Sequence, residues 1–146
     1  MGESNLASEP LRILTAVPLC DGHDSAVMAV NQALIHHGFE VVYLGYHRSV
    51  KDIVRAAIQE DVMAVGISSY NGGHLEFFRE VVESLARVGR DDIGVFGGGG
   101  GTITPADVVL MKGYGVDEIF LAGTSFECID GRLRELYGGG QDRTKY

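Results

Sequence analysis

The chain has 146 residues, of which 45% are hydrophobic, and its formal net charge is −8. This length suits one domain with a substantial core, and the apolar content argues against disorder. Scattered basic residues in an acidic chain disfavour nucleic acid and anionic membranes as partners, and no apolar run approaches the roughly 20 residues of a membrane span. The polar N-terminus lacks a signal-peptide pattern, and Cys20 and Cys128 lack zinc or redox spacing, so we expect reduced thiols in a cytoplasmic protein.

Strand and helix patterns alternate in the first part of the chain. Leu11–Val17 predicts a strand, and Ala26–His37 follows it with apolar residues at helical spacing. Glu40–Leu44 predicts the second strand. Ser49 can cap the next helix, with Asp52 three residues on, in the position of a capping box.

The same alternation continues to the end of the chain. Met63–Ser68 is almost continuously apolar, which is typical of a strand covered on both faces, and helical spacing follows over residues 75–85. Ile93–Phe96 predicts the fourth strand, and Pro105 is placed where proline can start a helix. The last strand and helix are predicted at Val116–Leu121 and Phe126–Tyr137.

Five strands, each followed by a helix and without a hairpin signal, predict an α/β fold with a five-stranded doubly wound parallel sheet. Among five-stranded orders we favour the flavodoxin-like (Rossmann-like) order 2-1-3-4-5, which periodicity alone does not establish. We expect one domain over residues 10–137, between flexible tails at residues 1–9 and 138–146.

The loops after the first, third, fourth and fifth strands are expected to meet at one edge of the sheet, where open α/β folds bind ligands. The first of these loops reads Asp21-Gly22-His23-Asp24-Ser25-Ala26. The Asp21 carboxylate could hydrogen-bond one imidazole nitrogen of His23 and leave the other as a metal ligand. A surface loop that is merely rich in polar residues is the alternative interpretation.

The other three loops are rich in glycine. They read Ser68-Ser69-Tyr70-Asn71-Gly72-Gly73, Gly97-Gly98-Gly99-Gly100-Gly101-Thr102 and Ala122-Gly123-Thr124-Ser125. Five successive glycines permit positive φ and the close approach of a bulky ligand to bare backbone. The alternative is a flexible linker, although a position between a buried strand and a helix suits a linker poorly.

Other chemistries have weaker support. The glycine-rich fingerprint of dinucleotide sites is absent after the first strand, as is the Gly-Lys-Ser/Thr ending of phosphate loops. His36 and His37 end a predicted helix and are interpreted as structural. His47 is expected on the loop after the second strand, and His74 near the proposed site. A three-histidine or histidine–carboxylate metal site stays open, although no H-E-x-x-H spacing supports one.

In this order the loops resemble the cobalamin-binding domain that acyl-CoA mutases, glutamate mutase and methionine synthase share. Asp21-Gly22-His23 matches the start of the family pattern D-x-H-x-x-G, in which Ala26 replaces the final glycine. Ser68-Ser69-Tyr70 matches S-x-L with tyrosine for leucine, and the run 97–101 supplies the G-G element.

The resemblance spans roughly residues 10–137. Within the family, the phrases Ser68–His74 and Phe96 followed by five glycines are most similar to the cobalamin domain of fused isobutyryl-CoA mutases.

The resemblance implies adenosylcobalamin as the cofactor and His23 as the lower ligand of cobalt, with Asp21 orienting the imidazole. Ser68 would hydrogen-bond in the pocket for the nucleotide tail, Tyr70 would line it, and the glycine run would let the tail pass. The remaining implied cofactor contacts are Gly22, Asp24, Ser25, Ala26, Gly72, Gly73, His74, Gly97, Gly98, Gly99, Gly100 and Gly101, with Gly123 and Thr124 closing the far end of the pocket.

Family members of this kind start radical carbon-skeleton rearrangements. Substrate binding needs a TIM barrel of roughly 250 residues, so the resemblance implies the cobalamin-binding small subunit of an isobutyryl-CoA or methylmalonyl-CoA type mutase. It would be inactive without a large acyl-CoA-binding subunit, and a G-protein chaperone is a further implied partner. A stand-alone cobalamin carrier or sensor is the alternative. A receiver-type signalling domain is disfavoured because Asp21 and Asp24 follow the first strand rather than the third.

Overall fold

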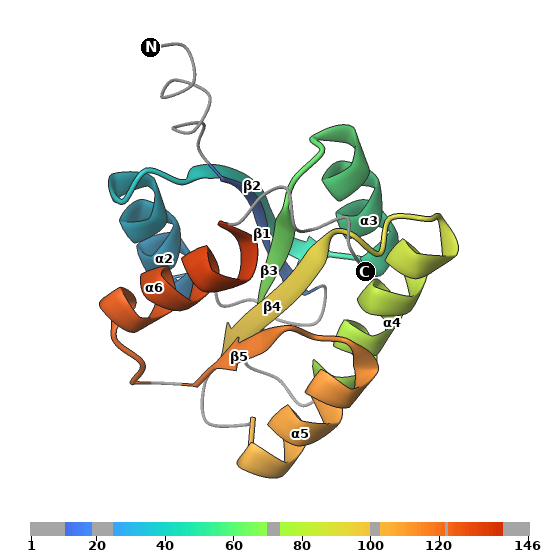
Figure 1. The fold of residues 1–146 in the computed structure, drawn as a ribbon. Coiled ribbons are helices and arrows are strands. Elements are labelled where there is room, and N and C mark those ends of the chain that lie inside the picture. The colour runs from blue at the N-terminus through green and yellow to red at the C-terminus, as the bar shows by residue number, and fades with distance from the viewer. Residues whose placement is uncertain (1–10, 19–24, 70–73, 100–102, 122, 139–146) are drawn as a thin grey trace.

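The computed structural model describes residues 11–18, 25–69, 74–99, 103–121 and 123–138 (Figure 1). Strands and helices alternate within these ranges as β1 (Arg12–Pro18), α2 (Ser25–His36), β2 (Glu40–Arg48), α3 (Val50–Gln59), β3 (Ala64–Ser69), α4 (His74–Arg87), β4 (Gly94–Gly99), α5 (Pro105–Tyr114), β5 (Glu118–Phe120) and α6 (Phe126–Tyr137). None of the helices in these ranges combines the length and apolar character that a membrane crossing demands. The two predicted tails lie outside the described residues, apart from Gly138.

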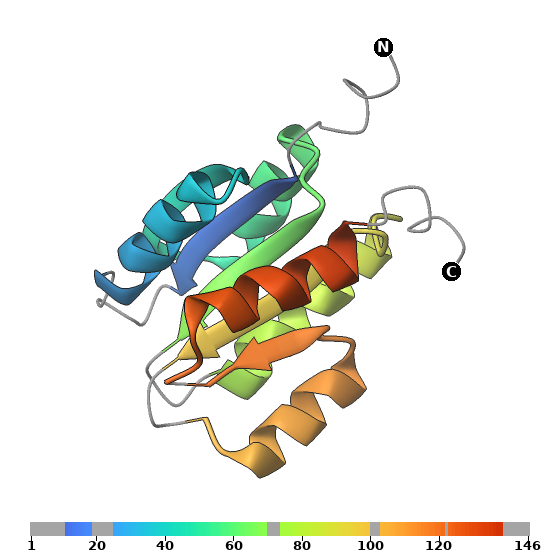
Figure 2. The ribbon, with the colours of Figure 1, turned by 60° about the vertical axis from the view of Figure 1, so that its left-hand side comes forward.

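All neighbouring strands are parallel, in the order β2-β1-β3-β4-β5, which confirms the predicted doubly wound sheet. Helices α3, α4 and α5 cover one face of the sheet, and α2 and α6 cover the other (Figure 1). Figure 2 shows the arrows of β1 and β4 ending at the same edge. The strand order reverses between β1 and β3, so the ligand edge of this fold lies at their carboxyl ends.

Side chains that alternate along each strand divide the core into two layers. Leu14, Val65 and Ile67 pack with α3, α4 and α5, whereas Ile13 and Phe96 pack with α2 and α6. All five of these residues are buried. This alternation tells which face of the sheet each residue near the ligand edge belongs to.

Two strands are longer than predicted. β2 continues past Gly45, whose φ of +102° accompanies register shifts against β1, and it ends at Arg48. His47 therefore lies in β2, and its predicted place on a loop is wrong. β4 continues to Gly99, so Gly97, Gly98 and Gly99 belong to the sheet rather than to the loop that follows it.

Capping residues place helix N-termini at the ligand edge. Ser49 caps α3 as expected, because its Oγ accepts a hydrogen bond from the Asp52 backbone N at 3.2 Å. Thr104, directly before Pro105, and Asp107, two residues after it, form a complete capping box at the start of α5. These caps fix where the chain turns from strand to helix.

Candidate functional site

Much of the predicted site falls in segments that the structure does not describe. Asp21, Gly22, His23 and Asp24 lie between β1 and α2, outside the described residues. The same holds for the predicted contacts Tyr70, Gly72, Gly73, Gly100 and Gly101. The first of these segments joins the end of β1 to the start of α2, so the assignment of His23 as a cobalt ligand stays a prediction.

Three further predicted residues begin helices at the ligand edge. Ser25 and Ala26 are the first residues of α2, and His74 is the first of α4. Both helices follow strands whose carboxyl ends form this edge. The backbone therefore brings these positions to the expected place.

Ser68 and Gly98 are direct neighbours across β3 and β4, on the face that α2 and α6 cover. The face follows from alternation, because Gly98 stands two residues after Phe96, which packs on that side. A Cβ built on Gly98 would have the Phe120 carbonyl oxygen at 2.9 Å, and its nearest atoms all belong to Phe120 rather than to a covering helix. The partly exposed Ser68 side chain has no hydrogen-bond partner among the described residues. Together they form a stretch of bare backbone beside an available hydroxyl.

Gly97 faces the opposite side of the sheet, where α4 closes the space. A Cβ at Gly97 would lie 2.6 Å from Phe78 Cε1, closer still to Phe78 Cζ, and 2.9 Å from the Ile67 carbonyl oxygen. Phe78 is fully buried. Gly97 and Gly98 lie in β4 and neither has positive φ, so the predicted loop and its alternative, a flexible linker, are both wrong for these two positions. At Gly97 the absent side chain makes room for Phe78.

The predicted far end of the site is a tight turn between β5 and α6. Gly123 has φ +92° and is exposed, and nothing lies within 4 Å of the Cβ position. The backbone N and the Oγ1 of Thr124 both donate to the Leu121 carbonyl oxygen, at 3.1 and 2.6 Å. The Thr124 hydroxyl proton is thus used within the turn, which leaves its oxygen lone pairs for a ligand.

A buried polar pair near the site was missed by the sequence reasoning. Thr15 of β1 donates to Asn31 Oδ1 of α2 at 2.8 Å, and the two residues are 2% and 4% exposed. Thr15 pairs with Gly66 of β3, on the same face as Ser68. A threonine inside an apolar strand and an asparagine inside a helix were the only sequence signals.

Two histidines, His36 at the end of α2 and His37 directly after it, lie away from the ligand edge. His36 lies in the last turn of α2. The His37 ring packs on Phe126 at 4.8 Å between centroids, and its Nδ1 is 3.7 Å from Asp130 Oδ2. The structural interpretation of both fits this placement. Across the described ranges, no three His, Cys, Asp or Glu side chains come together as a metal site would require.

The perturbed carboxyl groups also lie away from the ligand edge. Burial raises the pKa of Asp117, which accepts a hydrogen bond from Tyr137 Oη at 2.9 Å, and burial raises the pKa of Tyr137 as well. Burial raises the pKa of Glu118, but hydrogen bonds from Lys112 and Arg132 outweigh it and lower that pKa overall. These groups stand at the start of β5 and the end of α6. The described part of the site therefore offers binding surface rather than a pair of acid–base catalysts.

The sequence model of the B12 binding domain matches residues 11–128, most of the chain. The chain belongs to the B12-binding domain family. This membership agrees with the parallel sheet, with the ligand edge and with the expectation from the four loops. Cobalamin is thus the ligand class of this family.

Relatives of this B12-binding domain include mutases in two arrangements. A fused isobutyryl-CoA mutase of Cupriavidus metallidurans is 44% identical over 110 residues, which cover 75% of this chain and 10% of the mutase. The 2-hydroxyisobutanoyl-CoA mutase small subunit of Aquincola tertiaricarbonis is 35% identical over 127 residues, which cover 87% of this chain and 92% of that subunit. The chain therefore spans about a tenth of the fused mutases that it matches and nearly all of the small subunit.

A solved structure shares the fold of this B12-binding domain. A cobalamin-binding protein from Desulfitobacterium hafniense superposes with a TM-score of 0.72 at 26% identity, over 86% of this chain and 59% of that protein. The family match and this solved structure thus agree on cobalamin binding.

Proposed function

We propose that this chain binds adenosylcobalamin at the carboxyl edge of its sheet and acts as the cobalamin-binding subunit of an acyl-CoA mutase. The observation that carries the proposal is the match over nearly the whole of a mutase small subunit, together with 44% identity to fused isobutyryl-CoA mutases. The substrate class we propose is a branched short-chain acyl-CoA of the isobutyryl-CoA or methylmalonyl-CoA type.

The described residues at the ligand edge fit a large cofactor with a long nucleotide tail. The backbone at Gly98 is bare on the α2/α6 face, and the Ser68 hydroxyl beside it can hydrogen-bond a tail that lies there. Gly123 adds open space at the end of β5. We assign the lower cobalt ligand to His23, with Asp21 as the group that orients its imidazole, on the basis of the D-x-H motif after β1.

When bound, adenosylcobalamin supplies the radical that starts a carbon-skeleton rearrangement. This chain would hold the tail and fix the orientation of the corrin. The acyl-CoA would be bound by a separate large subunit, which the similarity to a mutase small subunit supports. A G-protein chaperone as a further partner and a cytoplasmic location complete the proposal.

Cofactor binding is tested by absorbance titration of the apoprotein with adenosylcobalamin. Gly98→Ala and Ser68→Ala should weaken binding, whereas Gly113→Ala, a glycine in α5 with nothing within 4 Å, should leave it unchanged. Asp21→Ala should cost about 10–100-fold in affinity. Equal affinity in all of these variants would remove the proposed site from this edge.

The cobalt ligand is tested by electron paramagnetic resonance of the cob(II)alamin form. Superhyperfine coupling that follows isotopic labelling of histidine, and that is lost in His23→Ala, is the expected result. Coupling that follows labelled dimethylbenzimidazole would contradict the assignment.

The mutase role is tested by turnover of isobutyryl-CoA with a matching large subunit. We expect activity only when the two proteins and adenosylcobalamin are combined. Activity of this chain alone would refute the division of labour. Tight cofactor binding without any pairing would favour a cobalamin carrier or sensor.

A further inference from the structure

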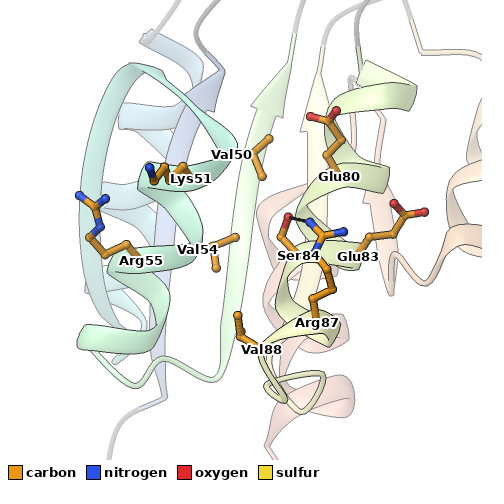
Figure 3. Close-up of a pocket in the computed structure, with 9 residues that line it drawn as sticks. All are labelled: Val50, Lys51, Val54, Arg55, Glu80, Glu83, Ser84, Arg87 and Val88. Carbon is orange, nitrogen blue, oxygen red and sulfur yellow. Dashed lines mark hydrogen bonds between the residues drawn. The ribbon is translucent and has the colours of Figure 1, made fainter.

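A groove of about 620 Å³ runs between α3 and α4, on the sheet face opposite Ser68 and Gly98 (Figure 3). Val50 and Val54 of α3 point toward α4 and form its floor, and Val88, which is 55% exposed, stands at one end. Lys51 and Arg55 lie along the outer flank of α3. The groove thus has an apolar centre and a basic rim on one helix.

The cations around this groove form no ion pairs with the residues that the structure describes. Elsewhere, each lysine and arginine whose side chain is described forms an ion pair, namely Arg12, Arg79, Arg90, Lys112, Arg132 and Arg134. Among the same described side chains, Lys51, Arg55 and Arg87 form none, and all three line this groove. In a chain with a net charge of −8, cations left without carboxylates are available to a partner.

The rim on α4 has the opposite sign. Glu80 has no ion pair among the described residues, and Glu83 has only a long one, 4.0 Å from Arg79. Both glutamates are exposed. Arg87, on the same helix, donates to Ser84 Oγ at 2.9 Å and so lies along α4. The α3 rim is therefore basic, and the α4 rim carries two glutamates together with Arg87.

We propose that this groove is the interface of a symmetric dimer, in which a second copy of the chain packs face to face about a two-fold axis parallel to α3 and α4. Both helices return from the ligand edge in the same direction, so this rotation sets α3 of one subunit against α4 of its partner. Lys51 and Arg55 then face Glu80 and Glu83 of the partner subunit, and symmetry repeats the contact. The apolar floors of the two grooves then face each other across the axis.

The two rims select a second copy over an unrelated acidic protein. An acidic partner would neutralise Lys51 and Arg55 but would leave Glu80 and Glu83 facing like charges. In the symmetric dimer each charged rim meets its opposite, and an apolar centre is surrounded by a polar rim, as in other protein interfaces. The interface leaves the α2/α6 face free, so it does not depend on the proposed cofactor site.

The proposal is tested by sedimentation velocity of the full chain from micromolar to millimolar concentration. The wild type should dimerise reversibly. K51E/R55E and E80K/E83K should each weaken the dimer by about tenfold or more, because like charges would then face each other. Circular dichroism and thermal melting of each variant confirm that it is folded.

Charge exchange provides the matched control. An equimolar mixture of K51E/R55E and E80K/E83K should form a mixed dimer whose total charge equals that of the wild-type dimer. The fourfold variant K51E/R55E/E80K/E83K should dimerise again by itself. A wild type that stays monomeric, variants that dimerise like the wild type, or a mixture that does not associate would each overturn the proposal. Cobalamin titration of the same variants should be unchanged, which separates this result from the proposed function.

Discussion

Gly97→Ala should destabilise the apoprotein, even though the substitution adds only a single methyl group. The new Cβ would lie 2.6 Å from Phe78 Cε1 and 2.9 Å from the Ile67 carbonyl oxygen, whereas carbon atoms in contact prefer about 3.5–4.0 Å. The Phe78 ring would have to move by about an ångström, and it is fully buried. Overpacking of this kind costs about 1–3 kcal/mol, and we expect about 2–3 kcal/mol because a backbone oxygen blocks the other direction.

The assay is urea denaturation of the apoprotein followed by circular dichroism. Gly113→Ala is the matched control, since Gly113 is exposed in the last turn of α5 and its Cβ would meet nothing within 4 Å. Alanine should stabilise that helix by about 0.5–1 kcal/mol. In a thermal melt the Gly97 variant should lose roughly 10 °C.

A double-mutant cycle identifies the cause of this loss. Phe78→Leu removes the ring atoms that the new methyl group meets, so Gly97→Ala should cost less in the Phe78→Leu background. The packing explanation fails if Gly97→Ala is as stable as the wild type. It also fails if the substitution costs the same in both backgrounds.

Three other substitutions test interactions away from the glycine run. For each variant, the free energy of unfolding is measured at several pH values. Thr15→Val should cost about 1–3 kcal/mol at all pH values, because buried Asn31 loses a hydrogen bond. Glu118→Gln should lower the free energy of unfolding by about 1 kcal/mol at pH 7, because it removes a carboxylate that binds two cations. Since these cations lower the pKa of Glu118, the difference from the wild type should disappear as the pH falls below 4.5. A difference that is constant with pH would refute the ionic cause. Asp117→Asn keeps an acceptor for the Tyr137 hydroxyl and should raise the free energy of unfolding near neutral pH. Burial raises the pKa of Asp117, so ionisation of this carboxyl destabilises the folded state as the pH rises above 3.8. A gain in stability that persists at lower pH would contradict this explanation.

The alternation of elements could be predicted from local signals. Hydrophobic periodicity predicted α6 at the residues observed, and the capping residue Ser49 predicted where α3 starts. Strand ends were less accurate because they depend on partners distant in sequence. The second strand was predicted to end at Leu44, but the positive φ of Gly45 lets β2 continue beside β1.

The candidate site shows the same division. The motifs located the ligand edge, and the family match agrees with them. The motifs could not show that Gly97 and Gly98 face opposite sides of the sheet, because that depends on the register of β4 with β3. Nor could they show that Phe78 fills the space beside Gly97.

The open side of the sheet at β5 has a consequence for aggregation. Exposed edge strands are templates on which strands of other molecules can add. This edge strand, β5, is three residues long. Its Glu118 forms ion pairs with Lys112 of α5 and Arg132 of α6, each at 2.9 Å, so charged side chains from both faces of the sheet meet at β5. The edge at β5, which is short and charged, should therefore resist amyloid-like strand addition, whereas the other edge of the sheet is the nine-residue β2.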